Sequence, residues 1–334
     1  MSKIKPAKGS PYARILGVGG YRPIRVVPNE VILETIDSSD EWIRSRSGIA
    51  TRHWASPEET VAAMSVEASG KALADAGVAP EQIGAVIVST VSHFKQTPAV
   101  ATEIAHRIGA VKPAAFDISA GCAGFGYGLT LAKGMVVEGS AEYVLVIGVE
   151  RLSDLTDLED RATAFLFGDG AGAVVVGPSA EPAIGPTVWG SEGDKSDTIK
   201  QTVPWDEFRT TDTAEKFPAI TQEGQAVFRW AVFEMAKVAQ QALDAAGITA
   251  DDLDVFIPHQ ANMRIIDSMV KTLKLPEHVT VARDVETTGN TSAASIPLAM
   301  ERLLATGAAK SGDTALVIGF GAGLVYAATV VTLP

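Results

Sequence analysis

Helix-like segments and short apolar runs alternate along most of the chain. Two of the helix-like segments end at a glycine, Gly77 and Gly247, and glycine is the residue that most often follows the last turn of a helix. Each glycine is followed by a short acidic stretch and then by a continuous apolar run, Ala85–Ser89 or Val255–His259. Runs of this kind are typical of strands buried on both faces, so the pattern predicts mostly parallel sheets covered by helices.

The two halves of the chain resemble each other at an offset of about 170 residues. Leu145–Gly148 matches Leu316–Gly319, and Cys122 falls opposite Ser292. Chance similarity between two helix–strand units is the alternative explanation. A duplication predicts two α/β halves that pack about a pseudo-twofold axis, and we place them at residues 1–178 and 179–334.

Two segments depart from this pattern. Gly185–Phe217 is polar and contains Pro186 and Pro204, which predicts a long surface excursion near an entrance. Thr314–Pro334 carries no charge, but its glycines favour two buried strands around a turn over a membrane span.

Composition narrows the class of protein. Of 334 residues, 46% are hydrophobic and 20% are charged, which predicts a soluble globular chain. A single cysteine cannot form an internal disulfide, and residues 1–10 have no apolar core of a signal peptide, so we expect a cytoplasmic protein. The net charge of −12, from 28 basic and 40 acidic residues, argues against nucleic acid as the main partner.

Cys122, His259 and Asn290 each follow a predicted strand. In open α/β sheets, ligands bind outside the carboxyl ends of the strands, so the duplication is expected to bring the three residues to one crevice. Helical spacing after Cys122 predicts that the thiol lies at a helix N-terminus, which would lower its pKa and favour a nucleophile.

Each of the three residues also has an ordinary structural explanation. Cys122 alone fits a buried structural thiol, and His259 alone fits a hydrogen-bond donor. Asn290 alone fits the N-cap of a helix over Ser292–Ala305. The turn Gly319–Gly323 offers closely approachable backbone N–H groups that would form an oxyanion hole with Cys122, but a tight turn between strands has the same composition.

Several motifs in fixed order resemble the β-ketoacyl-[acyl-carrier-protein] synthase III family, and in particular its actinobacterial members. The resemblance runs from about Tyr12 to the C-terminus and is carried by Gly121–Gly124, His259–Asn262, Gly289–Pro297 and Gly319–Gly323, with Ser39–Ile49 and Phe167–Gly172. It implies a thiolase-like, duplicated αβαβα fold, a homodimer, and an acyltransferase that needs no metal or organic cofactor. The implied activity starts fatty acid biosynthesis.

The resemblance also implies roles for individual residues. Cys122 would take an acyl group from acyl-CoA, and malonyl-acyl carrier protein would bind next. His259 and Asn290 would donate hydrogen bonds to the malonyl thioester oxygen while CO2 leaves. The resulting carbanion would attack acyl-Cys122, with the backbone N–H groups of Cys122 and Ala322 holding the oxyanion. Phe167 would shape the acyl pocket.

Binding residues follow from the same resemblance. For CoA, they are Trp42 and Arg161 around the adenine, Arg46 at the pyrophosphate and Asn262 near the pantetheine arm. For the acidic carrier protein, they are the basic residues Arg264, Arg229, Lys271 and Lys274. Each basic residue could equally be a solvated position on a helix face.

One position differs from relatives that use acetyl-CoA. They have a phenylalanine that reaches across the dimer into the acyl pocket, and this chain has Thr97. The smaller side chain predicts that branched or longer primers are accepted, such as isobutyryl-, isovaleryl- or butyryl-CoA. Thr210–Phe217 is also short compared with relatives.

Related activities fit less well. A thiolase needs a second cysteine, and elongating synthases have histidine in place of Asn290. Type III polyketide synthases differ in the His259–Asn262 motif. A non-catalytic scaffold usually lacks the cysteine. A specialised priming ketosynthase of a polyketide pathway remains the alternative.

Overall fold

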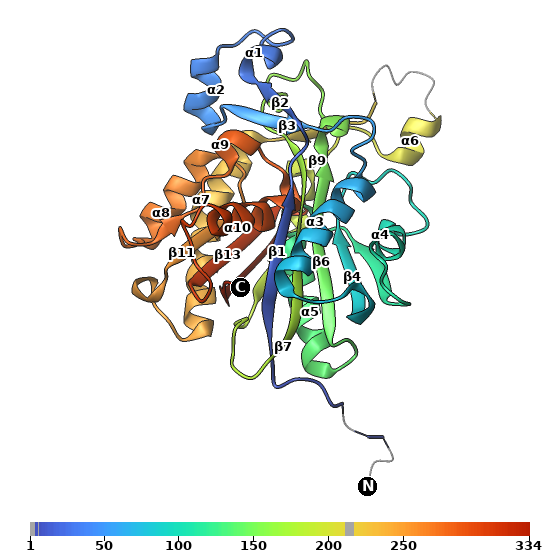
Figure 1. Cartoon of the computed structure of the whole chain (residues 1–334). Helices are drawn as coiled ribbons and strands as arrows, with labels where there is room; N and C mark the ends of the chain where they lie inside the picture. The colour runs from blue at the N-terminus through green and yellow to red at the C-terminus, as the bar shows by residue number, and fades with distance from the viewer. Residues whose placement is uncertain (1–3, 6, 211–216) are drawn as a thin grey trace.

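The computed structural model describes residues 4–5, 7–210 and 217–334. Two five-stranded sheets alternate with three layers of helices, and each sheet comes from one half of the chain (Figure 1). The first sheet has the order β1 (Tyr12–Tyr21), β7 (Asp169–Ser179), β6 (Tyr143–Arg151), β4 (Ile83–Ser89) and β5 (Ala114–Ile118). The second has the order β12 (Thr280–Val281), β11 (Val255–Pro258), β13 (Thr314–Gly321), β14 (Val325–Thr332) and β8 (Val188–Ser191).

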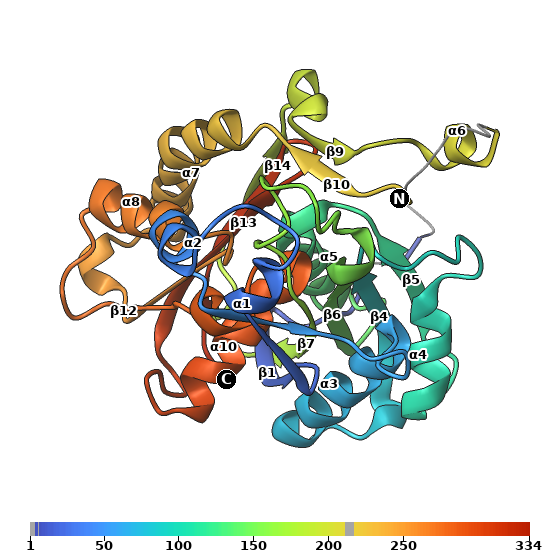
Figure 2. The same ribbon diagram turned by 90° about the horizontal axis from the view of Figure 1, so that it is seen from above.

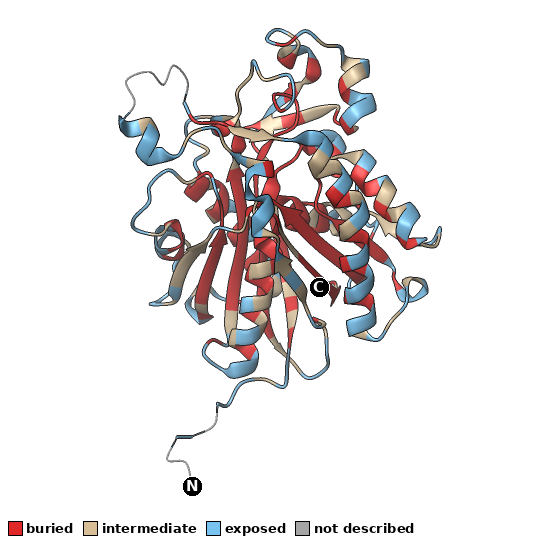
Figure 3. Cartoon of the chain, turned by 180° about the vertical axis from the view of Figure 1, so that it is seen from behind, coloured by how far each residue is buried: buried red, intermediate tan, exposed pale blue. Residues whose placement is uncertain are grey.

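Helices cover both faces of both sheets. One outer layer consists of α3 (Val61–Ala76) and α4 (Val100–Ile108), and the other consists of α7 (Gly224–Ala246) and α8 (Met263–Leu273). Between the sheets lie α5 (Gly124–Glu138) and α10 (Ser295–Ala305). The central strands of both sheets are buried almost throughout, the edge strands β5, β8 and β12 are only partly buried, and the outer helices expose one face (Figure 3). This arrangement confirms the predicted αβαβα layers.

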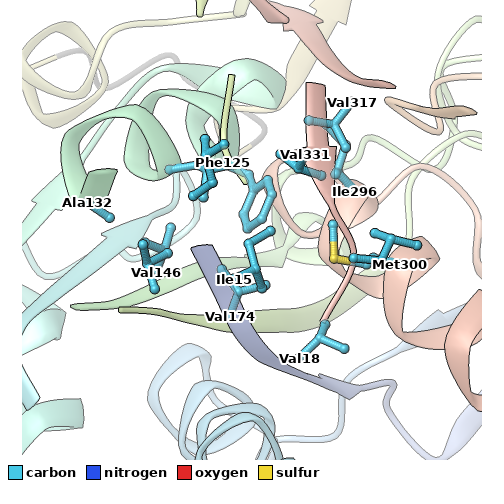
Figure 4. Packing of buried hydrophobic residues seen from close by; sticks show 14 of the residues in the cluster. Ile15, Val18, Phe125, Ala132, Val146, Val174, Ile296, Met300, Val317 and Val331 are labelled. Carbon is cyan, nitrogen blue, oxygen red and sulfur yellow. The ribbon is translucent and has the colours of Figure 1, made fainter. Parts of the chain in front are cut away.

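The middle layer is the largest apolar core. Phe125 of α5 and Met300 of α10 are fully buried between the sheets, where they meet Val146 of the first sheet and Val317 of the second (Figure 4). The apolar residues spaced along α5 face this core, as the helical spacing after Cys122 predicted; they are Phe125, Leu129, Ala132 and Val136.

The two sheets have the same plan. In each sheet, two neighbouring pairs are parallel and two are antiparallel, so four strands run in one direction and only β7 or β14 runs against them. The helices α3 and α7 both end at a glycine with positive φ, Gly77 at 63° and Gly247 at 72°. The predicted duplication is therefore present in the structure.

The predicted match of Cys122 with Ser292 is wrong by one residue. The turns η2 (Gly121–Ala123) and η6 (Ser292–Ala294) begin with similar left-handed residues, Gly121 at φ 48° and Ser292 at φ 47°. The position equivalent to Cys122 is therefore Ala293. The second half has one more residue between its first central strand and this turn, which sequence comparison alone did not locate.

Each of these turns packs on the central strand of the other half. A Cβ added at Gly148 of β6 would lie 2.1 Å from the carbonyl oxygen of Ala293, and one added at Gly319 of β13 would lie 2.9 Å from the carbonyl oxygen of Cys122. Only glycine fits at such close approaches. The two halves therefore meet through a reciprocal contact directly beneath the thiol.

The excursion Gly185–Phe217 is only partly as predicted. Its residues 188–191 form β8 and complete the second sheet, and Ile199–Gln201 form β9, which pairs with β10 (Ile220–Gln222). The remainder includes the exposed helix α6 (Trp205–Thr210). Residues 211–216, within the segment predicted to be short, lie outside the described residues.

A small cap lies above the carboxyl ends of the strands. It consists of β2 (Arg25–Pro28), α1 (Asn29–Ile32), α2 (Asp40–Ser47) and β3 (Thr51–Trp54), and the β9–β10 ribbon lies on the same side of the molecule (Figure 2). Thr314–Pro334 forms β13 and β14, and within the described part of the chain no helix has the length and apolarity needed to cross a bilayer. The boundary at residues 178 and 179 falls at the end of β7 and stays a prediction.

Candidate active site

One cavity of about 210 Å³ contains all three predicted catalytic residues, Cys122, His259 and Asn290. Phe167 and Ala322 also line it. Its remaining wall is mostly apolar and includes Val91, Leu152, Leu155, Ile199, Ile220 and Phe320. The structure therefore brings the predicted nucleophile, imidazole and carboxamide to one largely apolar chamber.

Cys122 lies in η2, and the end of β13 packs tightly against it. A Cβ added at Gly321 would lie 2.8 Å from Cys122 Sγ. Burial raises the pKa of the Cys122 thiol to about 12, against a hydrogen bond from Ser292 that lowers it. This direction is opposite to the predicted lowering, because loss of hydration in the apolar chamber outweighs the hydrogen bonds that favour the thiolate.

His259 directly follows β11 and is 2% exposed. Its backbone N–H donates to Ile318 O at 2.7 Å, and its Nδ1 lies 2.7 Å from Ser295 Oγ. Its ring stands edge-on to Phe320 with the ring centroids 5.4 Å apart. Burial lowers the pKa of His259 to about 3, so the imidazole is neutral at physiological pH.

Asn290 is fixed by its backbone and by its side chain. Its N–H donates to Leu166 O at 2.9 Å, and its carbonyl accepts from Gly168 N at 3.0 Å, so it pairs with the segment around Phe167. Its side-chain Oδ1 accepts from the backbone N–H of Ser292 at 2.8 Å. The amide oxygen therefore holds the first N–H of the turn η6, whose N-cap residue is Thr291, and it does not cap α10, which has no side-chain cap.

The backbone of Ala322 adjoins the turn that carries the thiol. A Cβ added at Gly121 would lie 3.3 Å from Ala322 N. Gly319 and Gly321 are required by close packing on η2, whereas Gly323 is required by its φ of 139°. Both residues predicted for the oxyanion hole, Cys122 and Ala322, line the same cavity, and the role of their backbone N–H groups stays a prediction.

A second, open cleft adjoins the cavity at Gln222, which lines both. The four predicted CoA contacts and two of the predicted docking residues line it; they are Trp42, Arg46, Arg161, Asn262, Arg229 and Arg264. The guanidinium of Arg161 lies 4.8 Å from the centre of the Trp42 ring, and that of Arg46 lies 5.7 Å from it. An adenine placed between Trp42 and Arg161 would have to displace Arg161.

Asn262 has a structural role besides its place in the cleft. Its Oδ1 accepts from Ile265 N at 3.0 Å and caps the N-terminus of α8. Arg264 lies over the ring of Phe228 at 4.9 Å. The other two docking residues, Lys271 and Lys274, are exposed at the far end of α8 and do not line the cleft.

Thr97 lies outside the cavity of its own chain. It is exposed in the segment before α4, and it is absent from the cavity wall. A contribution to the acyl pocket would require a second copy of the chain, so this role stays a prediction.

Sequence analysis missed two residues behind the thiol. Glu150, the penultimate residue of β6, is completely buried, and Ser292 connects it to Cys122. A glutamate that follows the apolar run Leu145–Gly148 was the available signal. The described residues contain no cluster of His, Cys, Asp or Glu suited to hold a metal ion.

Comparison with known proteins agrees with this geometry. Residues 116–193 match the model of the 3-oxoacyl-[acyl-carrier-protein] synthase III family, and residues 243–333 match the model of its C-terminal region. Two curated relatives are a β-ketoacyl-[acyl-carrier-protein] synthase III of Streptomyces glaucescens, 88% identical, and synthase III 1 of Streptomyces coelicolor, 87% identical. Each alignment covers 100% of both chains.

A solved structure is also similar over the whole chain. It is the priming β-ketosynthase from the R1128 polyketide biosynthetic pathway, with a TM-score of 0.97 and 47% identity over 100% of this chain and 99% of that one. The matched residues, the duplicated fold and the shared cavity lead to one assignment: this chain belongs to the β-ketoacyl-[acyl-carrier-protein] synthase III family of acyltransferases, among its actinobacterial members.

Proposed function

We propose that this chain catalyses the decarboxylating Claisen condensation of an acyl-CoA primer with malonyl-acyl carrier protein, by way of an acyl-Cys122 intermediate. The product is a 3-oxoacyl-acyl carrier protein, and the reaction initiates fatty acid biosynthesis. The observation that carries the proposal is the shared cavity of Cys122, His259 and Asn290, joined to a cleft lined by four arginines and a tryptophan.

The cleft suits the nucleotide end of CoA. Arg46, Arg161, Arg229 and Arg264 offer guanidinium groups to its phosphates, and the Trp42 ring offers a stacking surface to its adenine. The pantetheine arm would reach the thiol past Gln222.

Acylation forms a bond between Cys122 Sγ and the acyl carbon and breaks the bond from that carbon to the CoA sulfur. Since burial keeps the thiol protonated, it gives its proton to water as it attacks, and the departing CoA thiolate takes a proton back from water, so no proton is gained or lost overall. Backbone N–H groups of Cys122 and Ala322 would stabilise the oxyanion of the tetrahedral intermediate.

Decarboxylation requires hydrogen-bond donors at the malonyl thioester oxygen, where negative charge develops. Asn290 Oδ1 already faces the N–H of Ser292, so its Nδ2 is the group left to donate. The imidazole of His259 is neutral and carries one N–H. If the Ser295 hydroxyl donates to Nδ1, that hydrogen is on Nε2. With Ser295 as the donor to Nδ1, both side chains can donate at the thioester oxygen.

The remaining parts of the proposal concern partners and specificity. The enzyme would act as a cytoplasmic homodimer without a cofactor, and Arg264, Arg229, Lys271 and Lys274 would attract the acidic carrier protein. Thr97 from the second copy would leave room for branched or longer primers. An acyl-CoA panel tests this specificity: strict acetyl-CoA preference, unchanged in Thr97→Phe, would contradict it.

Mass spectrometry after mixing with acyl-CoA tests the main proposal. The parent should gain an acyl group on Cys122, and Cys122→Ala should gain none. His259→Ala and Asn290→Ala should still acylate but lose most of their release of CO2 from malonyl-acyl carrier protein. Condensation at the parental rate in either variant would show that its role is misassigned.

A priming ketosynthase of a polyketide pathway is the second candidate, because the structure of such an enzyme is similar over the full chain. The two functions differ in the carrier protein that receives the product. Condensation rates with a fatty-acid carrier protein and a polyketide carrier protein, measured with the same primers, decide between them.

A further inference from the structure

Glu150 is a buried carboxyl that the reaction above does not use. Its side chain has no exposure to solvent, and hydrogen-bond donors surround it. Ser92 Oγ donates to Glu150 Oε2 at 2.6 Å, Val91 N lies 3.1 Å from the same oxygen, and Thr90 Oγ1 lies 3.3 Å from it. The carboxyl is thus held in one position at the end of β6, behind the thiol.

Ser292 connects this carboxyl with the nucleophile. Its Oγ lies 3.3 Å from Glu150 Oε1, and Ser292 lines the cavity of Cys122, where a hydrogen bond from its side chain favours the thiolate and lowers the pKa of the thiol. Its backbone has a φ of 47°, a left-handed conformation that is uncommon for serine. A hydroxyl carries a single hydrogen, so Ser292 donates either to Glu150 or to Cys122, but not to both.

We propose that Glu150 controls the reactivity of Cys122 through Ser292, so that the thiolate forms only while Glu150 carries a proton. When Glu150 is ionised, the Ser292 hydroxyl donates its hydrogen bond to the carboxylate. The negative charge of that carboxylate then lies beside the sulfur and disfavours a thiolate there. Protonated Glu150 leaves Ser292 free to donate to the sulfur anion. The same donor stabilises the sulfur when condensation releases it from the acyl group, a step that rests on the proposed function.

Among the charged groups around the thiol, Glu150 is the one that we expect to change its charge near neutral pH. Arg151 on the same strand pairs with Asp154 at 2.9 Å, and Asp169 lies opposite Arg151 on β7. His259, in the same cavity, is neutral. Burial raises the pKa of Glu150 to about 7, against the donors around it, and burial raises the pKa of Asp169 to about 6.

Alkylation by iodoacetamide, followed by mass spectrometry, measures the reactivity of the single cysteine in the full chain. The reaction joins Cys122 Sγ to the reagent's CH2 group, expels iodide and releases the thiol proton to water. We expect the parental rate to rise with pH and to level off once Glu150 ionises, near pH 7. Glu150→Gln should match the parent at low pH and keep rising, becoming about a hundredfold faster by about pH 9.

Two further variants separate this effect from a structural one. Ser92→Ala removes the hydroxyl that donates to Glu150 at 2.6 Å and favours its ionised form. The pH at which the alkylation rate levels off should therefore be higher in this variant. Asp169→Asn is the matched control: this buried carboxyl is bonded to Ser153 and Ala55, and its variant should level off as the parent does.

A parental rate that rises without levelling, or Glu150→Gln and Ser92→Ala profiles that both superimpose on the parent, would overturn the proposal. If Glu150→Gln does not fold, the shift in Ser92→Ala decides alone. Failure of acyl-CoA to acylate Cys122, with the levelling intact, would count against the proposed function and not against this control.

Discussion

Replacing Gly321 with alanine should displace the nucleophile without unfolding the protein. The added Cβ would lie 2.8 Å from Cys122 Sγ, 2.9 Å from its Cβ and 3.0 Å from its backbone N. Carbon atoms in proteins pack at about 3.5–4.0 Å, so the overlap requires a movement of about 1 Å. Gly321 is held by its pairing with Val325 of β14, although the pairing of β13 with β11 ends at Ile318, so we expect the turn carrying the thiol to move.

The size of the effect follows from that displacement. A misplacement of about 1 Å at a reacting group costs about a hundredfold in rate. Overfilling a packed site typically costs about 1–3 kcal/mol of stability. We therefore expect Gly321→Ala to form acyl-Cys122 about a hundredfold more slowly while it still unfolds cooperatively. Quenched-flow mass spectrometry measures the first quantity, and urea unfolding measures the second.

Gly70 provides the matched control. It lies in α3, and a Cβ added there meets nothing within 4 Å. Gly70→Ala should acylate at the parental rate and gain up to about 1 kcal/mol of stability, because alanine favours a helix. Acylation of Gly321→Ala at the parental rate would refute the reasoning, since it would show that the thiol does not depend on this close contact.

Three further predictions concern stability and binding. Phe125→Ala opens a cavity between the sheets, so urea unfolding should show a loss of about 3–5 kcal/mol; a loss below about 1 kcal/mol would contradict its place in the core. Asn262→Ala removes the cap of α8 and should lower the free energy of unfolding by about 1 kcal/mol, whereas Asn262→Asp keeps the cap. If the KM for acyl-CoA is unchanged in Asn262→Asp, the residue caps the helix and does not bind CoA. Burial raises the pKa of Glu150 from 4.5 to about 7, so the folded state holds this proton more tightly, and the resulting stability is complete below pH 4.5 and lost as pH rises to about 7. Relative to Glu150→Gln, the parent should lose about 3 kcal/mol of unfolding free energy across that range, and parallel curves would contradict the shift.

The parts of the fold that were predicted depend on local patterns. Gly77 and Gly247 end helices because a left-handed residue is needed there, and continuous apolar runs form central strands because both of their faces are covered. The strand β8 was not recognised, because an edge strand with one covered face has a weaker pattern. The one-residue error opposite Cys122 arose because loop length is not fixed by hydrophobic pattern.

The part of the site that could be predicted from the sequence is the part whose position follows from the duplication. Cys122, His259 and Asn290 share a cavity because equivalent turns from the two halves meet there. The pKa of Cys122 was predicted in the wrong direction because burial of the sulfur depends on β13, far away in the sequence. Glu150 was missed for a similar reason: its donors come from the residues after β4 and from η6, and no short motif contains them.

The reciprocal contact between the halves limits how they can evolve. Gly148 leaves space for Ala293, and Gly319 leaves space for Cys122, so a bulkier residue in either strand would push on the turn contributed by the opposite half. Chimaeras that join the first half of one homologue to the second half of another should therefore work only when both members of each contact come from compatible parents.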